Sequence, residues 1–285
     1  MAGESLRPLG APFKRITIIG VGLIGGSLGL AIKRTFPSTV IVGVDKPAVL
    51  KSARKKGAID YSERNLHKGV SSAGLIFICT PVSVILKLMS KIARHCPPGT
   101  IVTDTGSVKS AILKKAKREF VGNFIGGHPM AGKERSGIAG AEPHLFRHAA
   151  WVLSPTPGTR GSQIRRLRSF LKALGASVVL MEPGKHDVAV SILSHVPQLL
   201  SVALMNTAGI RARKSLRMSG GGFRDMTRLA TSEPAMWRDI LSFNKSEVRR
   251  SLRLLTAELQ RYGRQLGTSK LEDAFRKSGR LKKDA

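Results

Sequence analysis

A glycine-rich turn between an apolar strand and a helix is the feature that most constrains the fold of this chain. Gly20, Gly22 and Gly25 follow the apolar run 15–19 and lead into a helical stretch at 27–34. Glycine lets the backbone turn tightly and approach a phosphate closely, while the start of a helix presents free amide donors to that phosphate. Because the GxGxxG spacing lies here between a strand and a helix, it predicts a dinucleotide-binding βαβ unit rather than a turn without a ligand.

Further apolar runs and helical stretches alternate along the chain up to about residue 183. The runs that we expect to be strands are 40–44, 75–79, 101–103, 124–125, 149–153 and 177–181. The helical stretches between them include 82–93, 109–120 and the basic segment 163–174. This alternation is typical of a parallel, doubly wound sheet with helices on both faces.

The pattern changes beyond that point, because strand signals stop. The long stretches 187–208 and 235–266 carry Leu, Ile and Met at helical spacing, and 268–285 is charged and weakly patterned. We therefore predict an α/β, Rossmann-like, doubly wound domain over residues 13–183, followed by an all-α domain over residues 184–285 with a frayed or partly helical end. Two domains also suit a chain of 285 residues, which exceeds what one hydrophobic core usually organises.

An acidic residue, Asp45, ends the second predicted strand. Its carboxylate is placed to accept hydrogen bonds from ribose hydroxyls and to repel a 2'-phosphate, so NAD is favoured over NADP, although Lys46 beside it weakens this preference. Loops at the carboxyl ends of such strands line the cofactor cleft, and one of them follows the run 75–79. The predicted cofactor-binding residues are Gly20, Gly22, Leu23, Ile24, Gly25, Asp45, Thr80 and Pro81.

His128 is the candidate general base. It lies in the sequence GGHPMAG directly after the run 124–125, and imidazole titrates near neutrality, so it can accept the proton of an alcohol whose hydride leaves for a nicotinamide. A single histidine in a loop is more often structural than catalytic, but glycines on both sides and a position at the edge of the sheet favour a catalytic role for His128. Ser107, in DTGSVK, is predicted to reach the same edge, either as a catalytic assistant or as the N-cap of the following helix.

Candidate substrate-binding residues come from the helical part. Ser191 and His195 are four residues apart, which places them on one helix face. Arg224 and Arg228 follow the glycines at 220–222, and a guanidinium group grips a carboxylate with two parallel hydrogen bonds. Without the glycine lead-in, either arginine would be interpreted as a surface residue of a very basic chain. These residues predict a small anionic substrate.

Composition narrows the class of partner. The chain has 48 Lys and Arg against 18 Asp and Glu, a net charge of +30, yet the basic residues are scattered without aromatic interleaving or a groove-reading motif. We therefore expect no specific nucleic-acid partner, only salt-sensitive adhesion to polyanions. The apolar run 16–32 contains five glycines, so we expect no membrane span or signal peptide and a cytoplasmic location. Cys79 and Cys96 are expected to be reduced core thiols, and no metal site is predicted.

Several separate motifs, in order, give the chain a resemblance to a known family. They are ITIIGVGLIGGSLGLA from Ile16, CTPV from Cys79, DTGSVK from Asp104, GGHPMAGKERSG from Gly126, SHVPQ from Ser194, GGGFRDMTRLA from Gly220 and MWRDI ending at Ile240. In these motifs, which cover about residues 14–266, the chain resembles the prephenate and arogenate dehydrogenases of tyrosine biosynthesis. The resemblance implies a Rossmann-like cofactor domain, a helical domain that forms a homodimer, and an active site in the cleft between them.

The resemblance also implies roles for individual residues. His128 matches the catalytic histidine that accepts the proton of the ring hydroxyl, and Ser107 matches a serine that assists at the same hydroxyl. Arg228 matches an arginine that binds a substrate carboxylate. Lys133 departs from the family pattern, since a small hydroxyl residue such as threonine is expected there. The substrate-site positions implied by the resemblance are Lys133, Glu134, Ser191, His195 and Arg228.

These features together predict the oxidative decarboxylation of prephenate to 4-hydroxyphenylpyruvate with NAD as hydride acceptor. Arogenate, which carries an amino group in place of the side-chain keto group, is the alternative substrate, although arginine-rich surroundings favour the more anionic prephenate. Two other classes stay open: a different two-domain hydroxyacid dehydrogenase, expected to use a lysine base, and an NAD-responsive protein that binds nucleic acid. The length leaves no room for a fused mutase or regulatory domain, so we expect no tyrosine feedback through such a domain.

Overall fold

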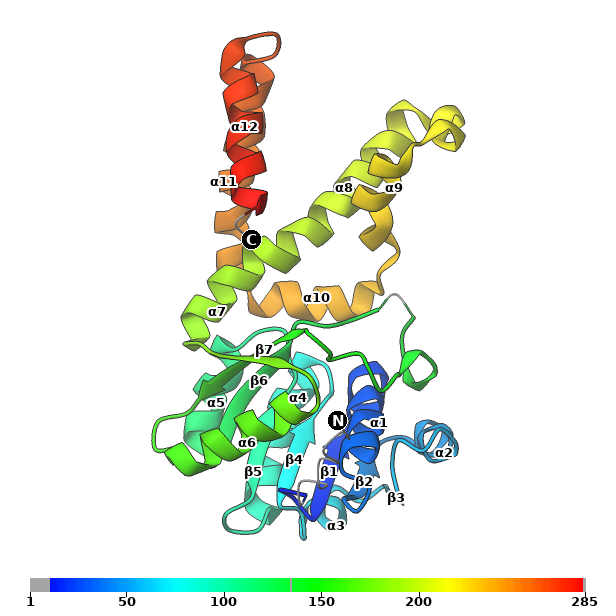
Figure 1. Ribbon diagram of the computed structural model, residues 1–285, viewed down its shortest axis with the longest axis vertical. Helices are drawn as coiled ribbons and strands as arrows, with labels where there is room; N and C mark the ends of the chain where they lie inside the picture. The colour runs from blue at the N-terminus through cyan, green and yellow to red at the C-terminus, as the bar shows by residue number, and fades with distance from the viewer. Residues whose placement is uncertain (1–10, 134, 284–285) are drawn as a thin grey trace, which may run out of the picture.

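The computed structural model describes residues 11–133 and 135–283, which form a sheet domain with a helical part standing on one edge of it (Figure 1). Within these residues the sheet has eight strands in the order β3-β2-β1-β4-β5-β6-β7-β8. The strands are β1 (Arg15–Ile19), β2 (Val40–Val44), β3 (Tyr61–Glu63), β4 (Leu75–Ile78), β5 (Ile101–Asp104), β6 (Phe124–Pro129), β7 (Ala150–Pro155) and β8 (Ser177–Leu180). The prediction of a doubly wound sheet is confirmed, because the strand order reverses between β1 and β4.

The prediction of an entirely parallel sheet was wrong for the last two strands. β7 pairs with β6 in antiparallel fashion, and β8 is parallel to β7. In its described residues, the connection from β6 to β7 contains a short 3-10 helix, η1 (Ile138–Gly140), and no helix that crosses the face of the sheet. The strand β7 therefore runs back from the edge where β6 ends. The edge strand β3 was not predicted, because Tyr61 and Ser62 are exposed and leave no apolar run.

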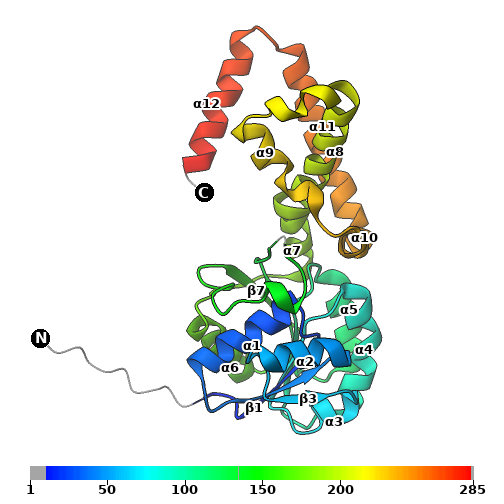
Figure 2. The ribbon, with the colours of Figure 1, turned by 90° about the vertical axis from the view of Figure 1, so that its right-hand side faces the viewer.

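Helices cover both faces of the sheet (Figure 2). The helices of this domain are α1 (Leu23–Thr35), α2 (Pro47–Lys55), α3 (Leu66–Val70), α4 (Val82–His95), α5 (Ser110–Glu119) and α6 (Gly161–Ala173). In β4, Leu75 and Phe77 pack into the core beneath α1 and α6, while Ile76 and Ile78 pack into the core beneath α4 and α5. A strand buried on both faces has no polar side to alternate with, which explains why it appears in the sequence as a continuous apolar run.

The helical part begins three residues after β8. Its first helix is continuous through α7 (Pro183–Val190), a π-helical segment η2 (Ser191–His195) and α8 (Val196–Arg211). The elements that follow are η3 (Arg213–Met218), α9 (Gly221–Thr227), η4 (Arg228–Thr231), α10 (Pro234–Phe243), α11 (Lys245–Arg264) and α12 (Ser269–Lys283). The all-helical prediction is therefore confirmed, with two differences in detail. The stretch 235–266 is broken at Asn244, and residues 269–283 form a regular helix rather than a frayed end.

The helical part is open. In Figure 1, α11 and α12 stand apart from α8 and α9. Large apolar side chains on α11 and α12 face solvent, such as Leu254 and Phe275, which are 67% and 73% exposed. Among the described residues, the path Pro183–Arg211 is the one helix long and apolar enough to span a membrane by length and composition. Helices at cores and subunit interfaces pass the same test, so this finding does not by itself indicate a membrane.

Candidate active site

The glycine turn is built so that β1 and α1 pack closely. Gly20 has a φ of +88°, which a residue with a Cβ rarely adopts, and its amide donates to the Val44 carbonyl at 2.9 Å. A Cβ on Gly25 would lie 2.0 Å from the Gly20 carbonyl oxygen. The helix α1 begins at Leu23, four residues earlier than predicted, so Gly25 lies in its first turn. The second and third glycines therefore have different roles: Gly25 allows the packing, while a Cβ on Gly22 would meet nothing within 4 Å.

A cleft of about 420 Å³ lies beside this turn, at the carboxyl ends of β1, β2 and β4. The Asp45 carboxylate is held in its wall, because Oδ2 accepts from the Val21 amide and Oδ1 accepts from the Lys46 amide, both at 2.7 Å. The Thr80 hydroxyl is buried there and has no hydrogen-bond partner among the described residues. The residues lining the cleft are Ile19, Gly20, Gly22, Val44, Asp45, Lys46, Cys79, Thr80 and Pro81.

Five of the eight predicted cofactor-binding residues thus line one cleft. The other three, Leu23, Ile24 and Gly25, form the first turn of α1 behind it. Burial raises the pKa of the Cys79 thiol to about 12, so this cysteine stays protonated, as expected of a core thiol. Open space next to Gly22, an acceptor at Asp45 and an unpartnered hydroxyl at Thr80 are groups that fit a dinucleotide.

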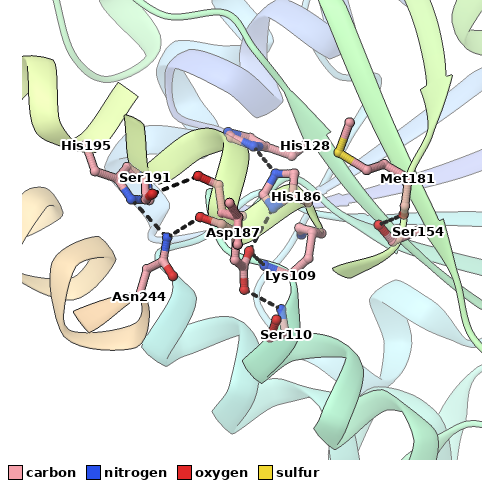
Figure 3. Close-up of polar contacts among 12 residues, drawn as sticks. Lys109, Ser110, His128, Ser154, Met181, His186, Asp187, Ser191, His195 and Asn244 are labelled. Carbon is pink, nitrogen blue, oxygen red and sulfur yellow. Dashed lines mark hydrogen bonds and ion pairs between the residues drawn. The ribbon is translucent and has the colours of Figure 1, made fainter. Parts of the chain in front are cut away.

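His128 is the next-to-last residue of β6 and is 7% exposed. Its Nδ1 lies 2.8 Å from Nε2 of His186, which belongs to α7 (Figure 3). Nδ1 of His186 lies 2.7 Å from Oδ1 of Asp187. The chain of contacts His128–His186–Asp187 therefore joins the end of strand β6 to α7, the first helix of the helical part.

Asp187 also caps α5. Its two carboxylate oxygens accept hydrogen bonds from the backbone amides of Lys109 at 2.7 Å and Ser110 at 2.8 Å. These amides belong to the start of α5, where no side chain of α5 itself forms a cap. Burial raises the pKa of Asp187, but the hydrogen bonds from His186 and from the two amides outweigh it, so the net shift is downward and the group is a carboxylate.

A buried ion pair lies between the ends of β5 and β6. Lys109 and Asp104 are both fully buried, and the Lys109 ammonium donates to Asp104 Oδ2. The same carboxylate accepts from the Gly106 amide at 2.8 Å and the Gly127 amide at 3.1 Å, which fixes the backbone immediately before His128. Burial lowers the pKa of Lys109, and the charge of Asp104 opposes that shift.

The surroundings hold His128 in its neutral form. Burial lowers its pKa well below the ordinary value of 6.5, and the charges that His186, Lys109 and His195 carry when protonated lower it further. A neutral imidazole has one unprotonated nitrogen and is therefore competent to accept a proton at physiological pH.

Ser107 lies between β5 and α5 and is partly exposed. Of the two roles predicted for it, the N-cap was wrong: the residue at the cap position is Lys109, and Asp187 from α7 supplies the capping carboxylate. A helix cap from another part of the chain cannot be read from the local sequence. The prediction that Ser107 assists catalysis stays a prediction.

Ser191 and His195 are the first and last residues of the π-helical segment η2, and both are buried. The Ser191 hydroxyl donates to the Val188 carbonyl at 2.7 Å and lies 2.6 Å from the hydroxyl of Ser251 in α11. His195 is 1% exposed, and burial lowers its pKa to about 4. Single π-helical turns inside α-helices are frequent at functional sites.

Three other residues predicted to bind the substrate, Lys133, Arg224 and Arg228, are exposed. Arg224 lies in α9 and Arg228 begins η4, beyond α8 in the helical part. Lys133, in the connection between β6 and β7, forms an ion pair with Glu142 of the same connection. Glu134 lies outside the described residues. The substrate contacts of all four residues stay predictions.

Sequence reasoning missed the polar residues that support His128. His186 and Asp187 lie in the middle of α7. Asn244, from the break before α11, donates to the Asp187 backbone carbonyl at 2.8 Å and lies 3.2 Å from His195 Nδ1. One signal in the sequence could have indicated Asp187. Asp187, Ser191 and His195 follow each other at intervals of four, so Asp187 lies on the helix face that was predicted for Ser191 and His195.

The same two-part organisation is found in known proteins. The model of the prephenate dehydrogenase nucleotide-binding domain matches residues 28–180, and that of the prephenate dehydrogenase dimerization domain matches residues 182–278. The chain belongs to the prephenate dehydrogenase family. The predicted resemblance and the predicted combination of a Rossmann-like domain with a helical dimerisation domain are thereby confirmed.

Members of the family with known names and structures match most of the chain. The prephenate dehydrogenase of Bacillus subtilis is 37% identical over 244 residues, which cover 82% of this chain and 65% of that protein. The crystal structure of arogenate dehydrogenase from Synechocystis is 32% identical, with a TM-score of 0.80, and covers 95% of this chain and 100% of that one. Prephenate dehydrogenase from Aquifex aeolicus, in complex with hydroxyphenyl propionate and NAD⁺, is 26% identical, with a TM-score of 0.87 and 99% coverage of both chains. The chain thus spans about two thirds of the length of the Bacillus relative and the whole length of the structural ones.

Proposed function

We propose that this protein is an NAD-dependent prephenate dehydrogenase, which converts prephenate to 4-hydroxyphenylpyruvate by oxidative decarboxylation. The observation that carries the proposal is a neutral, buried histidine, His128, at the same carboxyl edge of the sheet as the glycine-lined cleft. Bound NAD supplies the hydride acceptor. The membership of the chain in the prephenate dehydrogenase family supports the assignment of the substrate.

The reaction balances with His128 as the only protein group that exchanges a proton. The carbinol C–H bond breaks with loss of hydride, and His128 accepts the proton of the carbinol hydroxyl. The bond from the ring to its carboxylate then breaks, carbon dioxide leaves, and the ring becomes aromatic as the oxygen regains the proton. Aromatisation provides much of the driving force, so the task of the protein is mainly to orient the carbinol carbon.

The cleft fits NAD better than NADP. Both oxygens of Asp45 are already oriented by backbone amides, and a carboxylate so held retains lone pairs for ribose hydroxyls while repelling a 2'-phosphate. We propose that Gly20, Gly22 and Thr80 hold the remainder of the dinucleotide. The presence of NAD⁺ in the structure of the Aquifex relative supports this choice.

We propose that the substrate carboxylates are held by cations of the helical part and of the connection between β6 and β7. Arg228 is the first candidate, with Lys133 and Arg224 as the others, because guanidinium and ammonium groups bind carboxylates through charge-assisted hydrogen bonds. Ser107 is assigned to the carbinol hydroxyl. Ser191, His195 and Glu134 complete the proposed substrate site.

Arogenate is the second candidate substrate, because the Synechocystis relative, which matches 95% of this chain, is an arogenate dehydrogenase. The two substrates differ only in a keto or an amino group on the side chain. The excess of basic residues in this chain favours prephenate, which carries no ammonium group.

The test is the formation of NADH by the purified protein with prephenate, arogenate and small 2- and 3-hydroxyacids in parallel. We expect the highest kcat/KM with prephenate, together with the release of carbon dioxide. A higher kcat/KM with arogenate would move the assignment to the second candidate. NADH formation only with hydroxyacids, or tight salt-sensitive DNA binding without any NADH formation, would reject the proposal.

We also propose that the protein is a cytoplasmic homodimer without a specific nucleic-acid or membrane partner. The match of residues 182–278 to a dimerization domain and the exposed apolar side chains of α11 and α12 support the homodimer. Light scattering after size-exclusion chromatography tests it, and a monomeric mass at micromolar concentration would contradict it.

A further inference from the structure

We infer that His186, held by Asp187, is a positioning residue that fixes the tautomer of His128, with the proton on Nδ1 and the free lone pair on Nε2. This inference rests on the proposed function, because it concerns the nitrogen that accepts the substrate proton. It assigns a positioning role to two residues that the sequence analysis did not select.

Asp187 fixes one end of this chain of contacts. Its carboxylate already accepts hydrogen bonds from two backbone amides at the start of α5, which stabilise its charge. An ionised carboxylate only accepts hydrogen bonds. Nδ1 of His186, 2.7 Å from Oδ1 of Asp187, must therefore carry a proton.

The direction of the next hydrogen bond follows. In this inference His186 is neutral: a neutral imidazole carries one proton, so with that proton on Nδ1 its Nε2 is unprotonated and can only accept. Nδ1 of His128 lies 2.8 Å from this acceptor and must donate to it. Because His128 is also neutral, its single proton is then on Nδ1, and its Nε2 keeps the lone pair needed for the substrate hydroxyl (Figure 3).

A third buried histidine, His195, is fixed in the opposite tautomer by the same reasoning. The side-chain amide of Asn244 must present its NH₂ group to the Asp187 carbonyl, which only accepts, and this group also lies 3.2 Å from Nδ1 of His195. Nδ1 of His195 is therefore the acceptor and its Nε2 carries the proton. That Nε2 is buried and has no partner among the described residues. His128 thus offers an acceptor and His195 a donor, and only the acceptor can serve as the base.

The contacts also support His128 after it has accepted the proton. Its Nδ1–H then becomes a charge-assisted donor to His186, and the Asp187 carboxylate lies one ring further along the chain of contacts. The groups that oppose the positive charge are the Lys109 ammonium and, when protonated, His195 and His186. A base oriented by a second group, itself oriented by a carboxylate, is the arrangement on which many general-base sites depend.

Two substitutions of His186 separate the two hydrogen bonds. His186→Asn places an amide NH₂ near the position of Nδ1, so it keeps the bond to Asp187 but does not reach His128. His186→Gln places an amide oxygen near the position of Nε2, so it can accept from His128 but does not keep the bond to Asp187. His67→Gln, at an exposed histidine outside the site, is the matched control.

For His186→Asn we expect kcat with prephenate to fall about 10- to 100-fold, which is the usual cost of removing the residue that orients a functional histidine. KM for NAD should change less than about twofold. His186→Gln should lose less kcat than His186→Asn, because it restores the acceptor. A kcat for His186→Asn equal to that of the His67→Gln control would overturn the inference, as would a loss in His186→Gln as large as that in His186→Asn.

The tautomer itself can be measured in the unmodified protein, without activity and without a variant that must fold. Long-range ¹H–¹⁵N spectra of protein labelled with ¹⁵N-histidine, near neutral pH, distinguish a protonated from an unprotonated ring nitrogen, and His128→Gln assigns the signal. We expect a protonated Nδ1 and an unprotonated Nε2 for His128. The reverse, with the proton on Nε2, would show that His186 is the donor and would overturn the inference. If no substrate yields NADH while the Nδ1 proton is observed, the proposed function fails and the assignment of the tautomer stands.

Discussion

Alanine substitutions at Gly22 and Gly25 are expected to affect different properties: Gly25→Ala the stability of the fold, and Gly22→Ala the affinity for NAD. A Cβ on Gly25 would lie 2.0 Å from the Gly20 carbonyl oxygen and 2.9 Å from a methyl carbon of Ile18, so α1 or the turn must move by about 1 Å to reach an ordinary contact. A backbone carbonyl cannot rotate away as a side chain does. We therefore expect Gly25→Ala to lower the free energy of unfolding by about 3 kcal/mol, the upper end of the range for overpacked sites.

Gly22→Ala is the matched control for the fold and the test of the cleft. Its Cβ meets nothing within 4 Å, so the fold should lose no more than about 1 kcal/mol, the usual cost of alanine at a helix N-cap. The same open space lies in the wall of the cleft, where a methyl group would prevent the backbone from approaching the phosphates. The dissociation constant for NAD should therefore rise at least about tenfold, or about 1.4 kcal/mol.

Urea denaturation and calorimetric titration with NAD measure the two effects separately. We expect the large stability loss only in Gly25→Ala, and the loss of affinity for NAD with near-normal stability in Gly22→Ala. If Gly22→Ala bound NAD with unchanged affinity, the cleft beside Asp45 would not be the dinucleotide site. If Gly25→Ala were as stable as the unmodified protein, the close contact between the turn and α1 would be refuted.

Three further predictions concern pH, cofactor choice and salt. Burial lowers the pKa of His195 to about 4 and that of His128 well below 6.5, so the unfolded chain binds more protons than the native one below about pH 6.5. The free energy of unfolding should therefore be at its full value above about pH 6.5 and should fall as the pH drops toward 4. Urea midpoints that are constant across this range would contradict this prediction. The kcat/KM with NAD should exceed that with NADP at least about tenfold, and Asp45→Ser should reduce this ratio. Steady-state assays with both cofactors measure the ratio, and an unchanged ratio in Asp45→Ser would count against the role of Asp45 in excluding NADP. A net charge of +30 should make the thermal midpoint rise as NaCl increases from about 0.05 to about 0.5 M, and a midpoint indifferent to salt would argue against self-repulsion.

The parts of the fold that depend on local pattern could be predicted from the sequence. The turn at Gly20 and the acidic end of β2 at Asp45 are short-range features, and both appear in the same cleft. The direction of β7 could not be predicted in this way. It depends on whether the chain after β6 crosses the sheet or returns along its edge, and an apolar run such as 149–153 is the same in either direction.

The candidate site could be predicted only in part. His128 stood out because of its glycine frame, but its partner His186 lies 58 positions further along the chain, and no local pattern relates the two. Asn244 was predicted to be one position within a long helix, whereas its buried side-chain amide contacts both α7 and the π-helical segment η2. Contacts of this kind depend on how the helical part docks on the sheet, which hydrophobic periodicity does not specify.

The central claim is that His128 accepts the proton of the substrate hydroxyl, and His128→Ala tests it most directly. Single-turnover NADH formation with prephenate should slow by several orders of magnitude, while the dissociation constant for NAD, measured on the same preparation, should change only modestly. Near-normal turnover in this variant, with NAD still bound, would show that another group accepts the proton and would contradict the account.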